Sequence, residues 1–362
     1  MGIVRILTNA IRLQAVARVA QPKQTFAPLE LTKRLNIYLR SQFAGNGFVR
    51  FPISTDSCVT FDSTPEKIAG GVIYFDQTKS RDKPIKLVLI GDIHAALQNF
   101  NAIINKYRAG LEDGSVQLVF LGDLIHPERG SDLENMTTSI QIMRQMMVLM
   151  EQYPGQIHWV RGDHENLFDG NLHKGFIFQC DEMRKALASE AGPEFAEQYL
   201  QEVQAFFENL PYFAVIHGSQ GLTFAGHSPV SKGGRNFSDL VAAREDRSGP
   251  NHRSPYLYNR PTCFWHTREE RLAMGYDDID VRMTLKRLFN CDGAYQMFGF
   301  PRALSETDLA KITVVSGHNR LDDLSRFQLE GFTNTIFCLQ SFFSNPEIIE
   351  IEQGAISFTN LY

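Results

Sequence analysis

The chain has 362 residues, of which 43% are hydrophobic and 21% charged, with a formal net charge of -5. This ordinary globular composition allows one large domain or two average ones. The negative charge predicts no nucleic-acid partner, and no apolar run approaches the roughly 20 residues of a transmembrane segment. Five scattered cysteines without a C-x-x-C pair are typical of reduced thiols in a reducing, cytoplasmic compartment.

Residues 1–85 are expected to form a helical and loop extension that packs on the core. Residues 1–20 carry several arginines and no acidic residue, so a docked helix, a disordered tail and a helix that contacts a membrane surface all remain open. Apolar residues at helical spacing predict a helix over residues 29–43. Residues 48–75 are expected to form loops with one or two strands.

Three short aliphatic runs, at residues 86–90, 117–121 and 156–161, each end in Gly-Asp. Continuous aliphatic runs of this length predict strands buried on both faces. The stretches between them, 95–108 and 133–152, are long enough for crossover helices. Alternating strands and helices predict an α/β fold with a parallel sheet, in which ligands bind at the carboxyl edge of the strands.

The remainder of the chain, to residue 362, is expected to complete one catalytic domain. Two helices are expected within 183–207, broken near Gly192. A strand at 210–216 would lead through a hairpin turn at 217–220 to a return strand at 221–226. The other expected elements are a helix at 278–289 and strands at 311–316, 333–339, 347–352 and 355–359.

The ends of five predicted strands carry side chains that commonly bind metals. Carboxylates packed this closely would repel one another at pH 7, and divalent cations would remove the repulsion. Carboxylate and imidazole ligands suit Mn²⁺, Fe, Zn²⁺ or Mg²⁺. A single Gly-Asp after a strand is more often a turn, so the prediction depends on the joint pattern. The side chains expected to converge are Asp92, His94, Asp123, Asp163, His164, His227 and His318.

Over about residues 86–358 the motifs resemble those of the calcineurin-like metallophosphoesterases, and especially of the phosphoprotein phosphatase branch. Residues 91–94 are similar to GDxHG, 122–130 to GDxxDRG and 162–165 to GNHE, and two later histidines follow strands. The resemblance implies a sandwich of two mainly mixed β-sheets flanked by helices, with a dimetal site at the carboxyl edge of the strands. Within the branch, the chain looks similar to secreted bacterial effector phosphatases of the Legionella Wip type, which would place it in a host cell.

The resemblance also implies roles for individual residues. His164 would protonate the leaving oxygen with Glu128 as its partner, and Arg129 would bind phosphate oxygens. Arg161 is expected to pair with a site carboxylate and to contribute to substrate binding. Two divalent cations are implied, with Mn²⁺ expected first and Mg²⁺, Fe or Zn²⁺ as alternatives. The implied ligands are Asp92 and His94 for one cation, Asp123 for both, and Asp163, His227 and His318 for the other. A second phosphate-binding arginine is expected among Arg235, Arg253 and Arg268.

The sequence departs from the family pattern at two places. The second motif is longer by two residues and has Glu128 where the family has Asp, so His126 could intrude on the site. Asp163 stands where Asn is usual, and its extra negative charge predicts tighter metal retention. His217 is expected to cap the hairpin turn, although a misplaced hairpin would make it the ligand in place of His227.

These features favour a metal-dependent phosphatase that hydrolyses phosphoserine and phosphothreonine in a phosphoprotein partner. The altered second motif keeps phosphotyrosine open as a substrate. A dinucleoside polyphosphate hydrolase is an alternative, because that class shares the metal motifs. A non-enzymatic alternative is a scaffold protein with a degraded site. This alternative is disfavoured because all six expected metal positions carry residues that can bind a metal.

Overall fold

The computed structural model describes most of the chain between residues 84 and 228, together with shorter ranges on either side. Several expected features lie outside the described residues: the N-terminal segment 1–20, all of residues 42–71, the helix expected at 278–289 except for residue 286, and Arg129, Arg235, Arg253 and Arg268. The described ranges are 29–41, 72–77, 84–128, 130–170, 172–219, 221–228, 286, 303, 305–309, 311–318, 326–328, 335–338 and 346–362.

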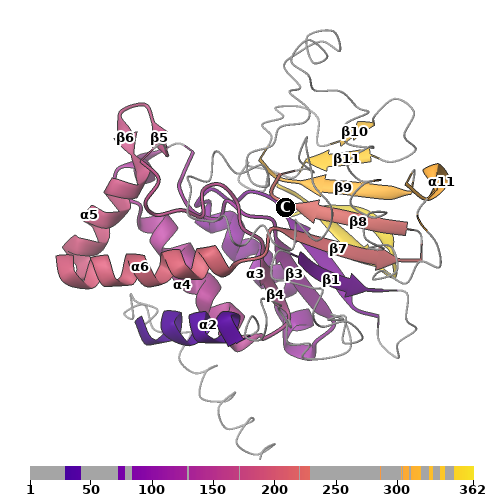
Figure 1. Ribbon diagram of the computed structural model, residues 1–362, viewed down its shortest axis with the longest axis horizontal. Helices are drawn as coiled ribbons and strands as arrows, with labels where there is room; N and C mark the ends of the chain where they lie inside the picture. The colour runs from indigo at the N-terminus through magenta and orange to yellow at the C-terminus, as the bar shows by residue number, and fades with distance from the viewer. Residues whose placement is uncertain are drawn as a thin grey trace, which may run out of the picture.

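Two mixed β-sheets form the centre of the fold (Figure 1). The larger has the order β1-β7-β8-β9-β11-β10 and the smaller the order β13-β12-β2-β3-β4. This arrangement confirms the predicted two-sheet α/β sandwich. The strands of the larger sheet are β1 (Val72–Asp76), β7 (Phe213–Gly218), β8 (Gly221–Gly226), β9 (Ile312–Ser316), β10 (Arg326–Gln328) and β11 (Thr335–Cys338). Those of the smaller are β2 (Lys86–Ile90), β3 (Val116–Phe120), β4 (Ile157–Trp159), β12 (Glu347–Glu352) and β13 (Ala355–Asn360).

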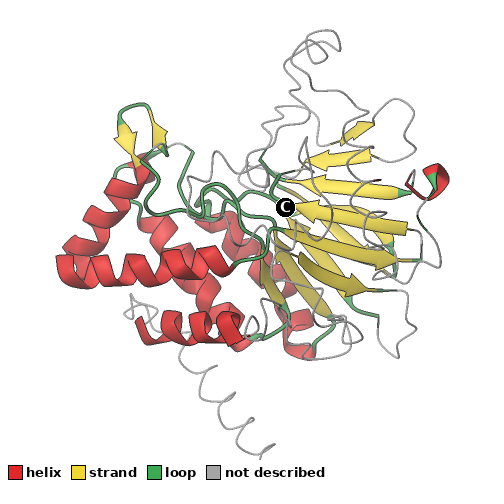
Figure 2. Ribbon diagram, in the orientation of Figure 1, coloured by secondary structure: helices red, strands yellow, loops and turns green. Residues whose placement is uncertain are grey.

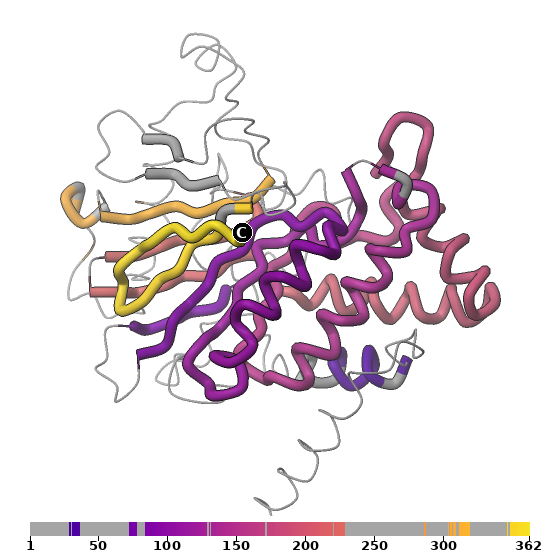
Figure 3. Tube along the Cα trace, turned by 180° about the vertical axis from the view of Figure 1, so that it is seen from behind, coloured from indigo at the N-terminus to yellow at the C-terminus, as the bar shows by residue number. Residues whose placement is uncertain are grey.

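Apart from the short α11, the helices gather on one side of the sandwich, as Figure 2 shows. Two of them are the predicted crossovers between parallel strands, and two others meet at Gly192, where the sequence predicted a break. Figure 3 shows α3 from behind, lying along the smaller sheet. No helix in the described ranges is long and apolar enough to cross a bilayer. The helices are α2 (Leu29–Ser41), α3 (Leu97–Asp113), α4 (Thr137–Gln152), α5 (Gln179–Ala191), α6 (Pro193–Asn209) and the short α11 (Glu306–Leu309).

The alternation of side chains along β2 explains why its aliphatic run is continuous. Leu87 and Leu89 belong to the core between the two sheets, whereas Val88 and Ile90 belong to the core beneath the helices. Successive side chains of a strand point to opposite faces, so a strand covered on both faces needs apolar residues at every position. The central strand is therefore buried on both sides, as predicted.

Strand β1 lies at the end of the range in which one or two strands were expected, and it pairs in parallel with β7 at the edge of the larger sheet. Two other features differ from the sequence-based expectations. His217 does not cap a turn: it lies within β7, where its Nδ1 is 3.0 Å from the Tyr74 hydroxyl. A small hairpin of β5 (His173–Lys174) and β6 (Ile177–Phe178) was not anticipated, because two-residue strands carry no detectable alternation.

Truncation of a core side chain of α3 tests this packing. Phe100 is fully buried and its ring lies 5.7 Å from that of Phe120. Phe100→Ala should lower the free energy of unfolding by about 3–5 kcal/mol, measured by urea denaturation. Val148→Ala, at a side chain that is 42% exposed on α4, should change it by less than about 1 kcal/mol. Equal losses in the two variants would contradict the described core.

Candidate metal centre

Five strand ends from the two sheets open onto one edge of the fold. In the smaller sheet β2, β3 and β4 are parallel neighbours, so the loops that follow them leave from the same edge. In the larger sheet β8 and β9 are also parallel, with Gly226 opposite Ser316 at their carboxyl ends. The side chains that follow these ends are all buried: Asp92, His94, Asp123, Asp163, His164, His227 and His318.

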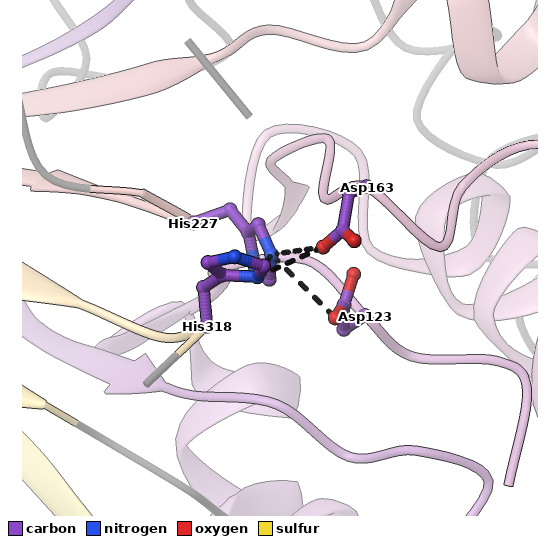
Figure 4. A group of neighbouring side chains, drawn as sticks. All are labelled: Asp123, Asp163, His227 and His318. Atoms are coloured by element: carbon purple, nitrogen blue, oxygen red, sulfur yellow. Dashed lines mark hydrogen bonds and ion pairs between the residues drawn. The ribbon is translucent and has the colours of Figure 1, made fainter. Parts of the chain in front are cut away.

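One group of side chains combines the third-motif loop with the two histidines that follow β8 and β9 (Figure 4). His227 Nε2 lies 2.7 Å from Asp163 Oδ1, and His318 Nδ1 lies 3.0 Å from the same oxygen. The two imidazole nitrogens are themselves 3.0 Å apart. Asp123 offers a fourth ligand atom within 4.8 Å of the others. Potential ligand atoms from four loops therefore converge closely enough to hold one metal ion.

A second group lies beside the first and shares Asp123 with it. His94 Nε2 is 3.7 Å from Asp92 Oδ2 and 3.6 Å from Asp123 Oδ2. His227 links the two groups, because its Nδ1 is 3.5 Å from Asp92 Oδ1 and its Nε2 is 3.5 Å from Asp123 Oδ2. The six residues expected to bind cations are thus brought together, with Asp123 common to both groups.

The aspartates of the two ligand groups lie close together, and the positively charged groups that could balance them are a few histidines. Burial raises the pKa of Asp123, and Asp163 and Asp92 raise it further against the opposing effect of His227. Burial also opposes ionisation of Asp163, but His318 and His227 outweigh it and hold that pKa well below its usual range. Divalent cations would relieve the repulsion, since buried like charges are otherwise costly. The donor set of carboxylates and imidazoles fits two such ions.

The loops that carry these side chains adopt strained backbone conformations. His94, Asp123 and His318 have φ values of 42°, 50° and 60°, in the left-handed region that residues other than glycine rarely adopt. Gly122, with φ of 98°, packs against the third-motif loop so closely that an added Cβ would lie 2.6 Å from the Cα of Gly162. Glycine in the second Gly-Asp pair therefore allows the two loops to touch, which places their aspartates side by side.

Glu165 holds the same two loops together, a role that the sequence analysis missed. Its buried carboxylate accepts hydrogen bonds from the backbone N–H groups of Gly162 at 2.6 Å, Asp123 at 2.8 Å and Leu124 at 2.9 Å. Asp123 in turn accepts one from the backbone N–H of His164 at 2.9 Å. The only signal for this role in the sequence is the glutamate that closes the third motif.

His164 lies beside the second group of ligands. Its ring meets that of His94 edge to face, with 4.9 Å between centroids. One polar atom from each of His94, Glu128 and His164 lies within 4.8 Å of the other two. Glu128 Oε1 is also 3.7 Å from His94 Nε2 and 2.5 Å from Lys174 Nζ. The expected partner of His164 is therefore close to it, together with a lysine that the sequence analysis did not single out.

His126 enters the surroundings of the site, but as a neutral group. Burial lowers the pKa of its side chain to about 3, and the positive charge of a protonated His94 would act in the same direction. Its backbone carbonyl lies 3.1 Å from His94 Nδ1. The lengthened second motif thus supplies an acceptor that orients a predicted metal ligand, as metal-bound histidines commonly require.

Arg161 lies behind the site. Its side chain is only 1% exposed, and its neighbours are Tyr212, to which it is hydrogen bonded, Glu208 and Glu165. Glu208 and Glu165 are near enough to act on the guanidinium electrostatically, and the expected pairing of Arg161 with a site carboxylate stays a prediction. Direct contact with a substrate would need exposed surface that the Arg161 side chain lacks. The expected contribution of Arg161 to substrate binding stays a prediction.

The chain belongs to the calcineurin-like phosphoesterase family, whose sequence pattern matches residues 85–320. This range includes all of the strand ends that converge at the site, from β2 to β9. The family assignment makes the protein a metal-dependent phosphoesterase, and it agrees with the donor set of the two ligand groups.

The solved structures that are similar to this chain include several phosphatases. A protein serine/threonine phosphatase from Saccharomyces cerevisiae, described as similar to human phosphatase PP5, is 13% identical with a TM-score of 0.51 and covers 92% of this chain and 90% of its own. A cold-active protein-tyrosine phosphatase from a Shewanella species is 14% identical with a TM-score of 0.40, covering 79% and 84%. A putative diadenosine tetraphosphatase is 14% identical with a TM-score of 0.36, covering 80% and 97%. The first likeness shows the fold alone, and the other two do not bear on the activity.

Removal of the Glu165 carboxylate tests how the two loops are joined. Glu165→Ala leaves three buried N–H groups without their acceptor, each at a cost of about 1–3 kcal/mol. We expect a free energy of unfolding lower by at least about 3 kcal/mol, together with weaker Mn²⁺ binding measured by titration calorimetry. Glu165→Gln should lose less, because one side-chain oxygen remains. Glu112→Ala, at an exposed position of α3, is the control, and an equal effect there would contradict the role of Glu165.

Proposed function

We propose that the protein is a metal-dependent phosphatase that hydrolyses phosphoserine and phosphothreonine monoesters in proteins. The observation that supports it most directly is the convergence of Asp163, His227 and His318 atoms within 3.0 Å of one another, beside His164. An imidazole next to a metal-binding carboxylate cluster is the combination that phosphomonoester hydrolysis needs: charge neutralisation and a proton donor.

The metal-binding roles in this proposal follow the two groups of side chains. When bound, two divalent cations would lower the pKa of a water molecule and neutralise the phosphoryl oxygens. Mn²⁺ is proposed first, because carboxylate-rich sites with imidazoles suit it, with Mg²⁺, Fe and Zn²⁺ as alternatives. The proposed ligands are Asp92 and His94 for one cation, Asp123 for both, and Asp163, His227 and His318 for the other.

His164 is the proposed donor of the proton that the leaving oxygen takes up. Burial lowers the pKa of His164 well below its usual value, which Asp163 opposes and a protonated His94 would reinforce. A phosphate dianion bound nearby would raise that pKa, since an opposite charge favours the protonated imidazole. Substrate binding would therefore help to place the proton on His164, with Glu128 as its orienting partner. Arg129 is proposed to bind phosphate oxygens, as the resemblance implies.

The roles of the histidines can be tested on p-nitrophenyl phosphate. His164→Ala should lower kcat about 100-fold or more while Mn²⁺ still binds, because a general acid is lost without a metal ligand. His227→Ala should lose Mn²⁺ affinity as well as turnover. His217→Ala is the matched control, because His217 lies at the opposite end of the β7–β8 hairpin, paired with Leu222. Unchanged turnover in His164→Ala alone would overturn its role as proton donor, and equal turnover in the wild type and both variants would favour the scaffold alternative, because the activity would not come from this site.

The substrate class can be tested with metal-stripped protein supplied separately with Mn²⁺, Mg²⁺, Zn²⁺ and Fe. We expect kcat/KM for phosphoserine and phosphothreonine peptides to exceed that for phosphotyrosine peptides and for dinucleoside polyphosphates, with Mn²⁺ the most effective ion. A higher kcat/KM for either alternative substrate would overturn the proposed specificity while leaving the phosphoesterase assignment in place. Action inside a host cell, implied by the resemblance to effector phosphatases, stays a prediction.

The aspartate that replaces the usual asparagine of the third motif should strengthen metal binding. Asp163 Oδ1 lies next to both His227 and His318, so its negative charge acts on any cation held there. Asp163→Asn should weaken Mn²⁺ binding roughly tenfold or more, because the substitution replaces a charged ligand by a neutral one of nearly the same size. Calorimetric titration of the stripped protein measures this change. Equal or tighter binding in the variant would contradict the prediction.

A further inference from the structure

The β5–β6 hairpin brings a lysine to the second ligand group. The hairpin is closed at its base by the hydrogen bond from Gln179 N–H to Leu172 O, at 3.0 Å. Gln179 also donates through its side-chain amide to the carbonyl of Pro127, at 2.8 Å. The hairpin is therefore held against the loop of the second motif, in which Glu128 accepts a hydrogen bond from Lys174 Nζ.

A single carboxylate, that of Glu128, lies between Lys174 and the predicted metal ligand His94. Lys174 Nζ lies 2.5 Å from Glu128 Oε1, and that oxygen lies 3.7 Å from His94 Nε2. The side chain of Lys174 is 25% exposed, compared with 12% for Glu128 and 7% for His94. The side chain of Lys174 is thus the most exposed of the three and the most accessible to a substrate that arrives from solvent.

The ammonium group also has donors to spare. Lysine carries three N–H groups, and among the described residues its hydrogen-bond and ion-pair partner is Glu128. A partly exposed ion pair of this kind contributes little to stability, so its position beside the site calls for another explanation. A phosphate group, which accepts several charge-assisted hydrogen bonds, could use the remaining donors.

We propose that Lys174 binds a phosphoryl oxygen of the substrate, with Glu128 holding the ammonium group in place before the substrate arrives. This inference rests on the proposed function, because it assumes a phosphate monoester next to His94 and His164. It adds a substrate-binding residue from a hairpin that lies outside the family motifs. The lysine supplies a point charge, so it contributes to affinity for the phosphate group and does not depend on the rest of the substrate.

The test is the affinity of the Mn²⁺-loaded full chain for inorganic phosphate, measured by calorimetry and as competitive inhibition of p-nitrophenyl phosphate turnover. Lys174→Met should weaken phosphate binding roughly tenfold or more, because a charge-assisted hydrogen bond is lost. Lys174→Arg, which keeps the charge, should retain most of the affinity. In turnover, Lys174→Met should raise KM more than it lowers kcat.

Two matched controls separate this role from a general disturbance of the protein. Phe176→Ala changes the fully exposed tip of the same hairpin. Lys185→Met removes an exposed lysine of α5 that has its own carboxylate partner, Glu182, at 2.7 Å. Both should bind phosphate as the wild type does. A weakening in either that matches Lys174→Met would overturn the proposal.

The outcomes distinguish this inference from the proposed function. Phosphate binding by Lys174→Met that equals the wild type overturns the role of Lys174, whatever the turnover of the wild type. A wild type that turns over no phosphomonoester, while Lys174→Met still loses phosphate affinity, overturns the proposed function and supports Lys174 as an anion-binding residue.

Discussion

The main physical constraint on this site is the close approach of three buried aspartates at one edge of the sandwich. Asp92, Asp123 and Asp163 follow three parallel strands of the smaller sheet, and His227 and His318 reach them from the larger one. Burial and mutual repulsion disfavour this arrangement, as the raised pKa of Asp123 indicates. The close packing of these aspartates is explained if divalent cations bind between them in the folded protein. Membership of the calcineurin-like phosphoesterase family agrees with such binding.

The surroundings of the aspartates resist that repulsion through the backbone. Glu165 accepts three N–H groups across two loops, and Gly122 allows these loops to touch. Gly317 has a related role, because an added Cβ there would overlap the carboxylate of Asp92, which also accepts the backbone N–H of His318. Close contacts between loops thus fix the ligands before any ion binds, and such preorganisation favours tight binding.

The same edge combines side chains from two kinds of element. The ligand groups follow the ends of long strands, whereas Lys174 comes from a short hairpin beyond the third motif. Glu128 joins the two, because its carboxylate contacts both the hairpin lysine and the surroundings of His94. Variation in loops around a conserved arrangement of strands is a common way for a fold to change its substrates.

By itself, the sequence determined the parallel strands, their crossover helices and the set of side chains at the strand ends. These follow from local patterns: aliphatic runs of strand length, Gly-Asp at their ends, and the shared edge of a parallel sheet. Only the tertiary structure decided that His227, and not His217, reaches the cluster, because the register of β7 and β8 places them at opposite ends of the hairpin. It alone also revealed the bond from Lys174 to Glu128 and the three bonds to Glu165. Those contacts join segments that are far apart in the chain or depend on backbone N–H groups. Contacts of either kind produce no repeating pattern in the sequence from which they could be predicted.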